Sequence, residues 1–225
     1  MGFKDIKQTA KIGGRKAKHP VNAEIEPVYE KALALIDSGE HEKARRVLMG
    51  LVELYPDEPR LLNSIGATYF QEEGDAVEAE RYFREALKRA PDLSPALANL
   101  SSLFGSLERF DEAAEYARRA IKYNPESAIP WMNLGLYYVR LGDLKSGLEY
   151  FLAAYSFDDG YLPAAYNAAC ALTELGRTDE ALEYLKKAAV KKRLREGALD
   201  DPVLAPLRES QEFKEIIAAI GEGRE

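Results

Sequence analysis

Apolar and small residues return along this chain at a spacing of 34 residues, in five successive segments. The segments begin at Ile25, Pro59, Ser94, Ala128 and Leu162, and the second contains one extra residue before Gly74. A bulky residue occupies the eleventh place of every segment: Leu35, Tyr69, Phe104, Tyr138 and Leu172. Small residues recur at the twentieth place: Ala44, Ala79, Ala113, Gly147 and Ala181. A fixed period of this length indicates a solenoid of small units that bury their apolar faces against one another.

Each segment is predicted to form two helices. Proline stands within the first three places of every first helix, where its missing N–H would be unpaired anyway: Pro27, Pro59, Pro95, Pro130 and Pro163. The first helices are predicted to end at Gly39, Gly74, Gly142 and Gly176, with Glu108 in that position in the third segment. An acidic residue opens most second helices, where each can cap exposed N–H groups and complement the helix dipole: Glu42, Asp75, Asp111, Asp143 and Asp179.

The repeated pattern resembles the tetratricopeptide repeat family. The fourth segment matches the family pattern best, at Trp131, Leu134, Gly135, Tyr138, Gly147, Phe151 and Ala154. The resemblance covers roughly residues 25–195 and weakens in the first and fifth segments, which we expect at the edges of the array. It implies an all-α fold, a right-handed α-solenoid of five tetratricopeptide-type helix pairs with a C-terminal capping helix.

The chain is accordingly divided into three parts. Residues 1–24 form a basic arm, which we expect to be mobile, and residues 196–225 form a capping segment and helix. The five repeats between them are residues 25–58, 59–93, 94–127, 128–161 and 162–195. In the tail, Ser210 can cap a last helix with an apolar face of Phe213, Ile216, Ile217 and Ile220. This helix either covers the exposed face of the last repeat or lies in the groove as an internal ligand.

The net charge of -7 conceals a basic N-terminus. Residues 1–24 contain six lysines and arginines against Asp5 and Glu24, so the remainder of the chain is acidic. An acidic body argues against a groove that follows nucleic-acid phosphates. The arm either contacts nucleic acid, a membrane or an acidic partner, or serves as a solubilising tail.

The sequence offers no pattern of catalytic or metal-binding residues. His19 and His41 lack cysteine partners at zinc-ligand spacing, and Cys170 is the only cysteine. We therefore expect no enzyme activity, no metal and no cofactor. A lone thiol, the lack of an apolar run of membrane length and the lack of a secretory signal favour a cytoplasmic location.

The resemblance implies that defined places on the first helices line a concave groove. Among these places are Asn63, Phe70, Met132, Leu136, Arg140 and Tyr166. The lining is mainly neutral and apolar, which suits an apolar or amphipathic peptide segment better than an acidic one. Asn99, Asn133 and Asn167 follow one another at the 34-residue spacing. Their carboxamides can pair with a bound peptide backbone, or they can be scaffold residues satisfied by neighbouring helices.

These observations predict a protein-interaction adaptor that holds a protein or peptide segment in its groove. The alternatives are a folding or assembly chaperone, a nucleic-acid-associated protein that uses the basic arm, and a regulatory subunit of an enzyme. The sequence leaves open the identity of the partner and the oligomeric state.

Overall fold

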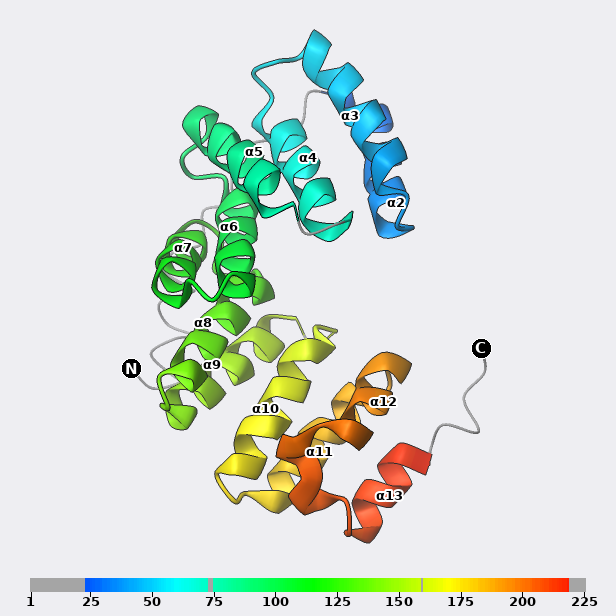
Figure 1. Ribbon diagram of the computed structural model, residues 1–225, viewed down its shortest axis with the longest axis vertical. Coiled ribbons are helices and arrows are strands. Elements are labelled where there is room, and N and C mark those ends of the chain that lie inside the picture. The colour runs from blue at the N-terminus through cyan, green and yellow to red at the C-terminus, as the bar shows by residue number, and fades with distance from the viewer. Residues whose placement is uncertain (1–22, 73–74, 159, 219–225) are drawn as a thin grey trace. The chain divides into compact units, whose positions relative to one another are not determined.

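The computed structural model describes residues 23–72, 75–158 and 160–218, and these residues form helices without any strand (Figure 1). They divide into two compact units, one ending at Pro125 and the other starting at Glu126. Residues 1–22, and with them nearly all of the basic arm, lie outside the described residues, as do Gly74 and Ile220.

The N-terminal unit contains the first three predicted repeats as helix pairs. Its helices are α2 (Glu26–Asp37), α3 (His41–Leu54), α4 (Pro59–Glu72), α5 (Ala76–Arg89), α6 (Ser94–Ser106) and α7 (Phe110–Tyr123). Each first helix packs against the second helix of its own pair, and the second helices α3 and α5 also pack against the following first helices. The apolar faces that the periodicity predicts are therefore buried within and between pairs.

The C-terminal unit contains the last two predicted repeats and the tail. Its helices are α8 (Ala128–Arg140), α9 (Leu144–Phe157), α10 (Leu162–Glu174), α11 (Thr178–Ala188), α12 (Lys192–Asp200) and α13 (Gln211–Ala218), with a 3-10 helix η1 (Pro202–Leu207). Trp131 on α8 is buried, and its ring stacks on Tyr150 and Phe157 of α9. Trp131, Leu134 and Phe151 are all buried, as the predicted phase of the repeat requires.

The first helices end in the same backbone motif in four repeats. Gly39, Gly142 and Gly176 have φ between +72° and +79°, and Glu108 has φ +58°. In each case the N–H of the residue after the left-handed one reaches back to a carbonyl in the last turn of the helix, as Arg109 does to Phe104 at 2.8 Å. This is the Schellman motif, which requires a left-handed residue at the helix end. The predicted ends of these four helices are thus correct, including the one that lacks glycine.

The predicted acidic caps of the second helices are correct for two of the five. Asp75 and Asp143 are N-cap residues whose carboxylates accept hydrogen bonds from the backbone N–H of Glu78 and Ser146, both at 3.1 Å. For Glu42, Asp111 and Asp179 the predicted capping is wrong, but the predicted position at the start of the helix is correct. These three residues lie in the first turn of helices that begin one residue before them, so they complement the helix dipole without capping it.

Arginine takes the N-cap position of two of these remaining second helices. Arg109 and Arg177 form two hydrogen bonds each to the carboxylates of Glu112 and Glu180, three residues later, at 2.5–2.7 Å. Both pairs are exposed, so their net contribution to stability is small.

In the second and fourth repeats, a small residue on the first helix faces a large residue on the second helix. A Cβ added to Gly66 would come to 2.7 Å from the ring of Phe83, and one added to Gly135 would overlap the ring of Phe151. In the third repeat, Ala117 replaces the phenylalanine and Ser101 replaces the glycine, and the Ser101 hydroxyl donates to the carbonyl of Ala113 at 2.8 Å. The close approach of the two helices therefore requires a small residue wherever an aromatic ring faces it.

The C-terminal tail covers the last repeat with more structure than the sequence predicts. Leu204 and Leu207 of η1 and Phe213 and Ile216 of α13 are buried in the core cluster that includes α10 and α11. The Ser210 hydroxyl caps α13 by accepting from the N–H of Phe213 at 3.1 Å, as predicted. Helix α12 was not predicted, and it begins before the expected end of the fifth repeat at residue 195.

Candidate functional site

The carboxamides of Asn63 on α4 and Asn99 on α6 meet in the N-terminal unit. Asn99 Nδ2 donates to Asn63 Oδ1 at 2.9 Å, and both side chains are half-buried. The bond is the one hydrogen bond that either side chain makes within the described part of the chain. It leaves the N–H groups of Asn63 and the Oδ1 of Asn99 available, so the pair still presents both a donor and an acceptor.

The sequence analysis allowed for a bond from Asn99 to a neighbouring helix, but it did not identify Asn63 as the partner. Asn63 stands at the fifth place of its repeat and Asn99 at the sixth place of the next, 36 residues apart. A search for identical places in successive repeats therefore misses the pair. The signal that could have found it is a polar residue at neighbouring groove places of adjacent repeats.

The two predicted asparagines of the C-terminal unit differ in how far they are buried. Asn133 on α8 is only 8 % exposed, whereas Asn167 on α10 is half-buried. One turn beyond Asn133, Leu136 is 39 % exposed and Arg140 is exposed. Met132 is half-buried and packs against the core of this unit. The accessible part of the predicted lining here is thus Leu136, Arg140 and Asn167.

Tyr166 on α10 is engaged by the tail of the same chain. Its hydroxyl donates to Asp201 Oδ2 at 2.7 Å, and the thiol of Cys170, one turn later, lies 3.7 Å from the same oxygen. Burial, together with this hydrogen bond, raises the pKa of the Tyr166 hydroxyl. Burial and the Asp201 carboxylate also raise the pKa of the Cys170 thiol. The thiol therefore stays protonated at neutral pH, which opposes nucleophilic reactivity.

Asp201 also organises the segment that follows it. Its Oδ1 accepts from the N–H of Val203 at 2.9 Å and so caps η1. Asp201, which precedes η1, thus engages Tyr166, a predicted groove place, and the neighbouring Cys170 of α10, while α13 packs against α11 and α12. Of the two alternatives for the last helix, α13 therefore follows the first, which is that it covers the last repeat.

Two aromatic side chains of the first helices, one of them at the predicted groove place Phe70, pack mainly inside the N-terminal unit. Phe70 is partly buried against the core cluster of Phe83, Leu103 and Phe104. Tyr29 is buried and its hydroxyl forms a hydrogen bond with Ser64 at 3.0 Å. These rings stabilise the array more than they offer contact area.

Within the described residues, no group of three or more His, Cys, Asp or Glu side chains is arranged to hold a metal ion. The same part of the chain contains no helix with the length and apolar character needed to cross a membrane. The N-terminal unit thus presents the Asn63–Asn99 amide pair, and the C-terminal unit presents Leu136, Arg140 and Asn167.

Family models of the tetratricopeptide repeat match most of the chain. One matches residues 29–94 and again residues 99–161, and a second matches residues 162–189.

Two curated relatives share parts of this sequence. The anaphase-promoting complex subunit cut9 of Schizosaccharomyces pombe (strain 972 / ATCC 24843) is 24 % identical over 175 residues, which is 75 % of this chain and 26 % of cut9. The protein adenylyltransferase Fic of Nematostella vectensis is 32 % identical over 99 residues, 40 % of this chain and 23 % of Fic. The chain thus spans about a quarter of the length of these relatives.

Solved structures show the same fold. PilF of Pseudomonas aeruginosa superimposes with a TM-score of 0.65 at 19 % identity, covering 86 % of this chain and 96 % of PilF. The Cut9–Hcn1 hetero-tetramer of the APC/C contains a chain that superimposes with a TM-score of 0.71 at 18 % identity, covering 97 % of this chain and 42 % of that one. The fold is therefore the predicted right-handed α-solenoid of helix pairs, and the chain belongs to the tetratricopeptide repeat family.

Proposed function

We propose that this protein is a non-enzymatic interaction scaffold that binds an extended or amphipathic peptide segment along its first helices and acts as a cytoplasmic adaptor. Membership of the tetratricopeptide repeat family supports a scaffold role, as does the fold shared with a subunit of the Cut9–Hcn1 assembly. The specific mode of binding rests on the side chains of this chain.

The observation that carries the proposal is the half-buried Asn63–Asn99 pair. A carboxamide that keeps an unused donor or acceptor can bond to the backbone of any peptide, whatever its sequence. Asn167 contributes a further half-buried amide in the C-terminal unit, and the exposed side chain of Leu136 adds apolar contact area. Tyr166 contributes little, because its hydroxyl already bonds to Asp201.

The test is a triple change, Asn99→Ala with Asn133→Ala and Asn167→Ala, measured against peptides selected on the unaltered protein from a random display library. Each hydrogen bond contributes about 0.5–1.5 kcal/mol. Because only Asn99 and Asn167 are accessible, the affinity should therefore fall by about ten- to a hundredfold. Because Asn133 is nearly buried, we expect its single change to lower stability more than the changes at Asn99 and Asn167 do.

A matched control is available on the second helices. Glu115, Glu149 and Glu183 follow the same 34-residue spacing in the same three repeats, and their triple change to alanine should leave peptide affinity unaltered. Unchanged binding in the asparagine triple variant, or equal loss in both triple variants, would show that the asparagines are scaffold residues.

A further inference from the structure

Many lysine and arginine side chains of the N-terminal unit are paired with acidic side chains. In one segment of the C-terminal unit, most of the lysines and arginines are not. On α5, Arg81, Arg84 and Arg89 each lie 2.5–2.7 Å from a glutamate of the same helix. Residues 186–195, at the end of α11 and the start of α12, contain six lysines and arginines and no acid. Among the described residues, only Lys192 of this segment has a carboxylate within ion-pair distance, Glu196 at 3.8 Å.

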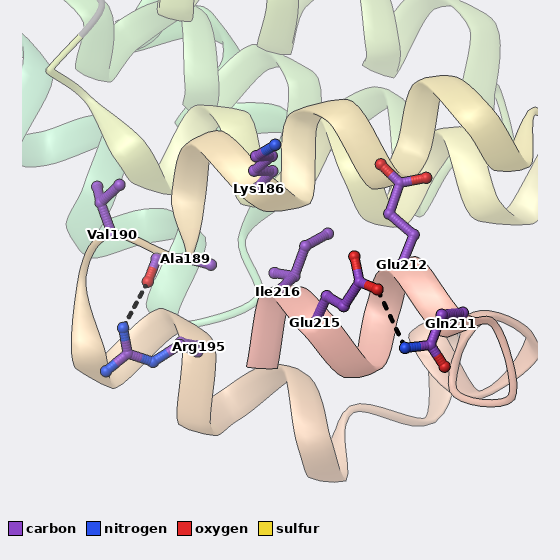
Figure 2. A pocket seen from close by; sticks show the side chains of 8 residues that line it. All are labelled: Lys186, Ala189, Val190, Arg195, Gln211, Glu212, Glu215 and Ile216. Carbon is purple, nitrogen blue, oxygen red and sulfur yellow. Dashed lines mark hydrogen bonds between the residues drawn. The ribbon is translucent and has the colours of Figure 1, made fainter. Parts of the chain in front are cut away.

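These cations border an open cavity of about 800 Å³ between α11, α12 and α13, here called the cap trough. Figure 2 shows its eight lining side chains: Lys186, Ala189, Val190, Arg195, Gln211, Glu212, Glu215 and Ile216. Ala189, Val190 and Ile216 provide its apolar surface. Lys186 and Arg195 come from α11 and α12, whereas Gln211, Glu212 and Glu215 come from α13. The trough thus has an apolar floor, one basic wall and one acidic wall.

Arg195 is held at the trough with unused hydrogen-bonding capacity. Its Nη1 donates to the carbonyl of Ala189 at 3.2 Å (Figure 2), which fixes the guanidinium against the turn after α11. Its Nε is buried and has no partner among the described residues. Because the Nε is closed to solvent, an anionic group that entered the trough would meet the Nη groups of the guanidinium instead.

Val190 supplies an apolar anchor beside these cations. It is 72 % exposed and lies in the turn between α11 and α12. An exposed aliphatic side chain that continues an apolar surface and is bordered by charged residues is the arrangement expected of a docking surface.

From this surface we propose that the cap trough binds a short amphipathic helix of a partner protein. The apolar face of that helix would lie on Val190 and Ile216, and its acidic flank would face Lys186 and Arg195. Helix α13, which forms the opposite wall, has eight residues. That wall is about 12 Å long, enough for two turns of a docked helix.

The acidic wall of the trough disfavours nucleic acids and anionic membranes as partners. Glu212 and Glu215 would repel the phosphates of a nucleic acid or of an anionic membrane that lay across the trough. A helix that carries acids on one flank and bases on the other can complement both walls at once. The trough uses none of the asparagines of the proposed peptide-binding surface, so the two sites can be tested separately.

The probe is a synthetic amphipathic peptide of about 15 residues, long enough to form helix, with leucines at three- and four-residue spacing, glutamates on one flank and lysines on the other. Its binding to the full chain is followed by fluorescence anisotropy. Val190→Asp should weaken binding at least about tenfold, because it places a charge on the apolar floor. Val77→Asp is the matched control, since Val77 is 77 % exposed on α5, and it should leave binding unchanged.

A second variant tests the basic wall. Lys186→Glu combined with Lys191→Glu should slow association and reduce its dependence on salt. Lys145→Glu on α9, at another exposed lysine, should do neither. A probe in which all glutamates are replaced by lysines should bind the double variant better than it binds the unaltered protein.

Two results would overturn the proposal. One is equal binding of the probe by the Val190→Asp and Val77→Asp variants. The other is failure of the probe to bind while vesicles of phosphatidylcholine and phosphatidylserine, or a single-stranded thymidine oligonucleotide, bind in a way that depends on Lys186 and Lys191. That result would assign the basic segment to phosphate recognition.

Discussion

Glu108 adopts a left-handed backbone conformation that glycine occupies in the equivalent positions of other repeats. Its φ of +58° lies in the region where an L-residue meets its own carbonyl, at a cost of about 1–2 kcal/mol. The hydrogen bonds of the motif are nevertheless formed, with Glu108 N–H 3.1 Å from the carbonyl of Gly105. The packing of the third repeat therefore holds this residue in a strained conformation.

Glu108→Gly is expected to stabilise the protein by up to about 1 kcal/mol, measured by urea unfolding. The relief of strain is partly offset by the greater freedom of glycine in the unfolded chain. Glu108→Ala removes the same side chain and keeps the strain, so the difference between the two variants isolates the backbone effect. The reciprocal change Gly142→Ala, where an added Cβ meets no atom within 4 Å, should destabilise by about 1 kcal/mol. Equal stability of Glu108→Gly and Glu108→Ala would contradict this account.

Gly135→Ala is expected to destabilise the protein by about 1–3 kcal/mol, because the new methyl group would overlap the ring of Phe151. Adding Phe151→Leu should recover part of the loss, since the fifth repeat combines Ala169 with Leu185 at the same places. Gly105→Ala on α6 is the control, because its Cβ would meet nothing within 4 Å. A double variant no more stable than Gly135→Ala alone would show that the volumes are not coupled.

At the scale of elements, the tail differs from the repeats in having no internal period. It joins the core of the C-terminal unit through Leu204 and Leu207 of η1 and Phe213 and Ile216 of α13. Asp201 connects the tail to α10 through the Tyr166 hydroxyl. The last helix pair of a solenoid would otherwise expose an apolar face, and these elements bury it.

Phe213→Ala should lower the free energy of unfolding by about 3–5 kcal/mol, because the ring is only 2 % exposed and its removal leaves a cavity. Leu199→Ala, at a side chain of α12 that is 43 % exposed, should change stability by no more than about 0.5 kcal/mol. Thermal or denaturant unfolding of the two variants makes the comparison. A loss at Phe213 as small as that at Leu199 would mean that α13 is not a cap.

At the scale of the whole molecule, burial is unevenly distributed over the helices. Helix α6 buries eight residues, whereas α2 buries Tyr29 and Ala32 and α13 buries Phe213 and Ile216. In a repeat array each unit is stabilised mainly by its neighbours, so local stability follows local burial.

Native-state hydrogen exchange should reflect this gradient. Amides of α6 should exchange at least about tenfold more slowly than amides of α2 and α13, which corresponds to about 1.4 kcal/mol or more in opening free energy. Mass spectrometry of peptic fragments gives the measurement for each helix. Uniform protection along the chain would instead indicate that the array opens as a single cooperative unit.

The sequence by itself determined the helix pairs, their phase and most of their ends. A 34-residue repetition of buried places determines which residues face inward. The φ of a helix-ending residue is a local property, and the glycines at positions 39, 142 and 176 indicate it in the sequence. Even Glu108 could be placed, because the repeat supplied its position. The Ser210 cap was predictable for the same reason, since a cap and its N–H partner lie three residues apart.

Only the tertiary structure decided the contacts that shape the surfaces. The Asn63–Asn99 bond and the Tyr166–Asp201 bond join residues more than 30 positions apart, and the paired positions are not equivalent in successive repeats. Helix α12 and the cap trough lie where the period ends, so no repetition could set their phase. Such contacts depend on how helices pack and on which rotamers their side chains adopt, and neither is a local property of the sequence.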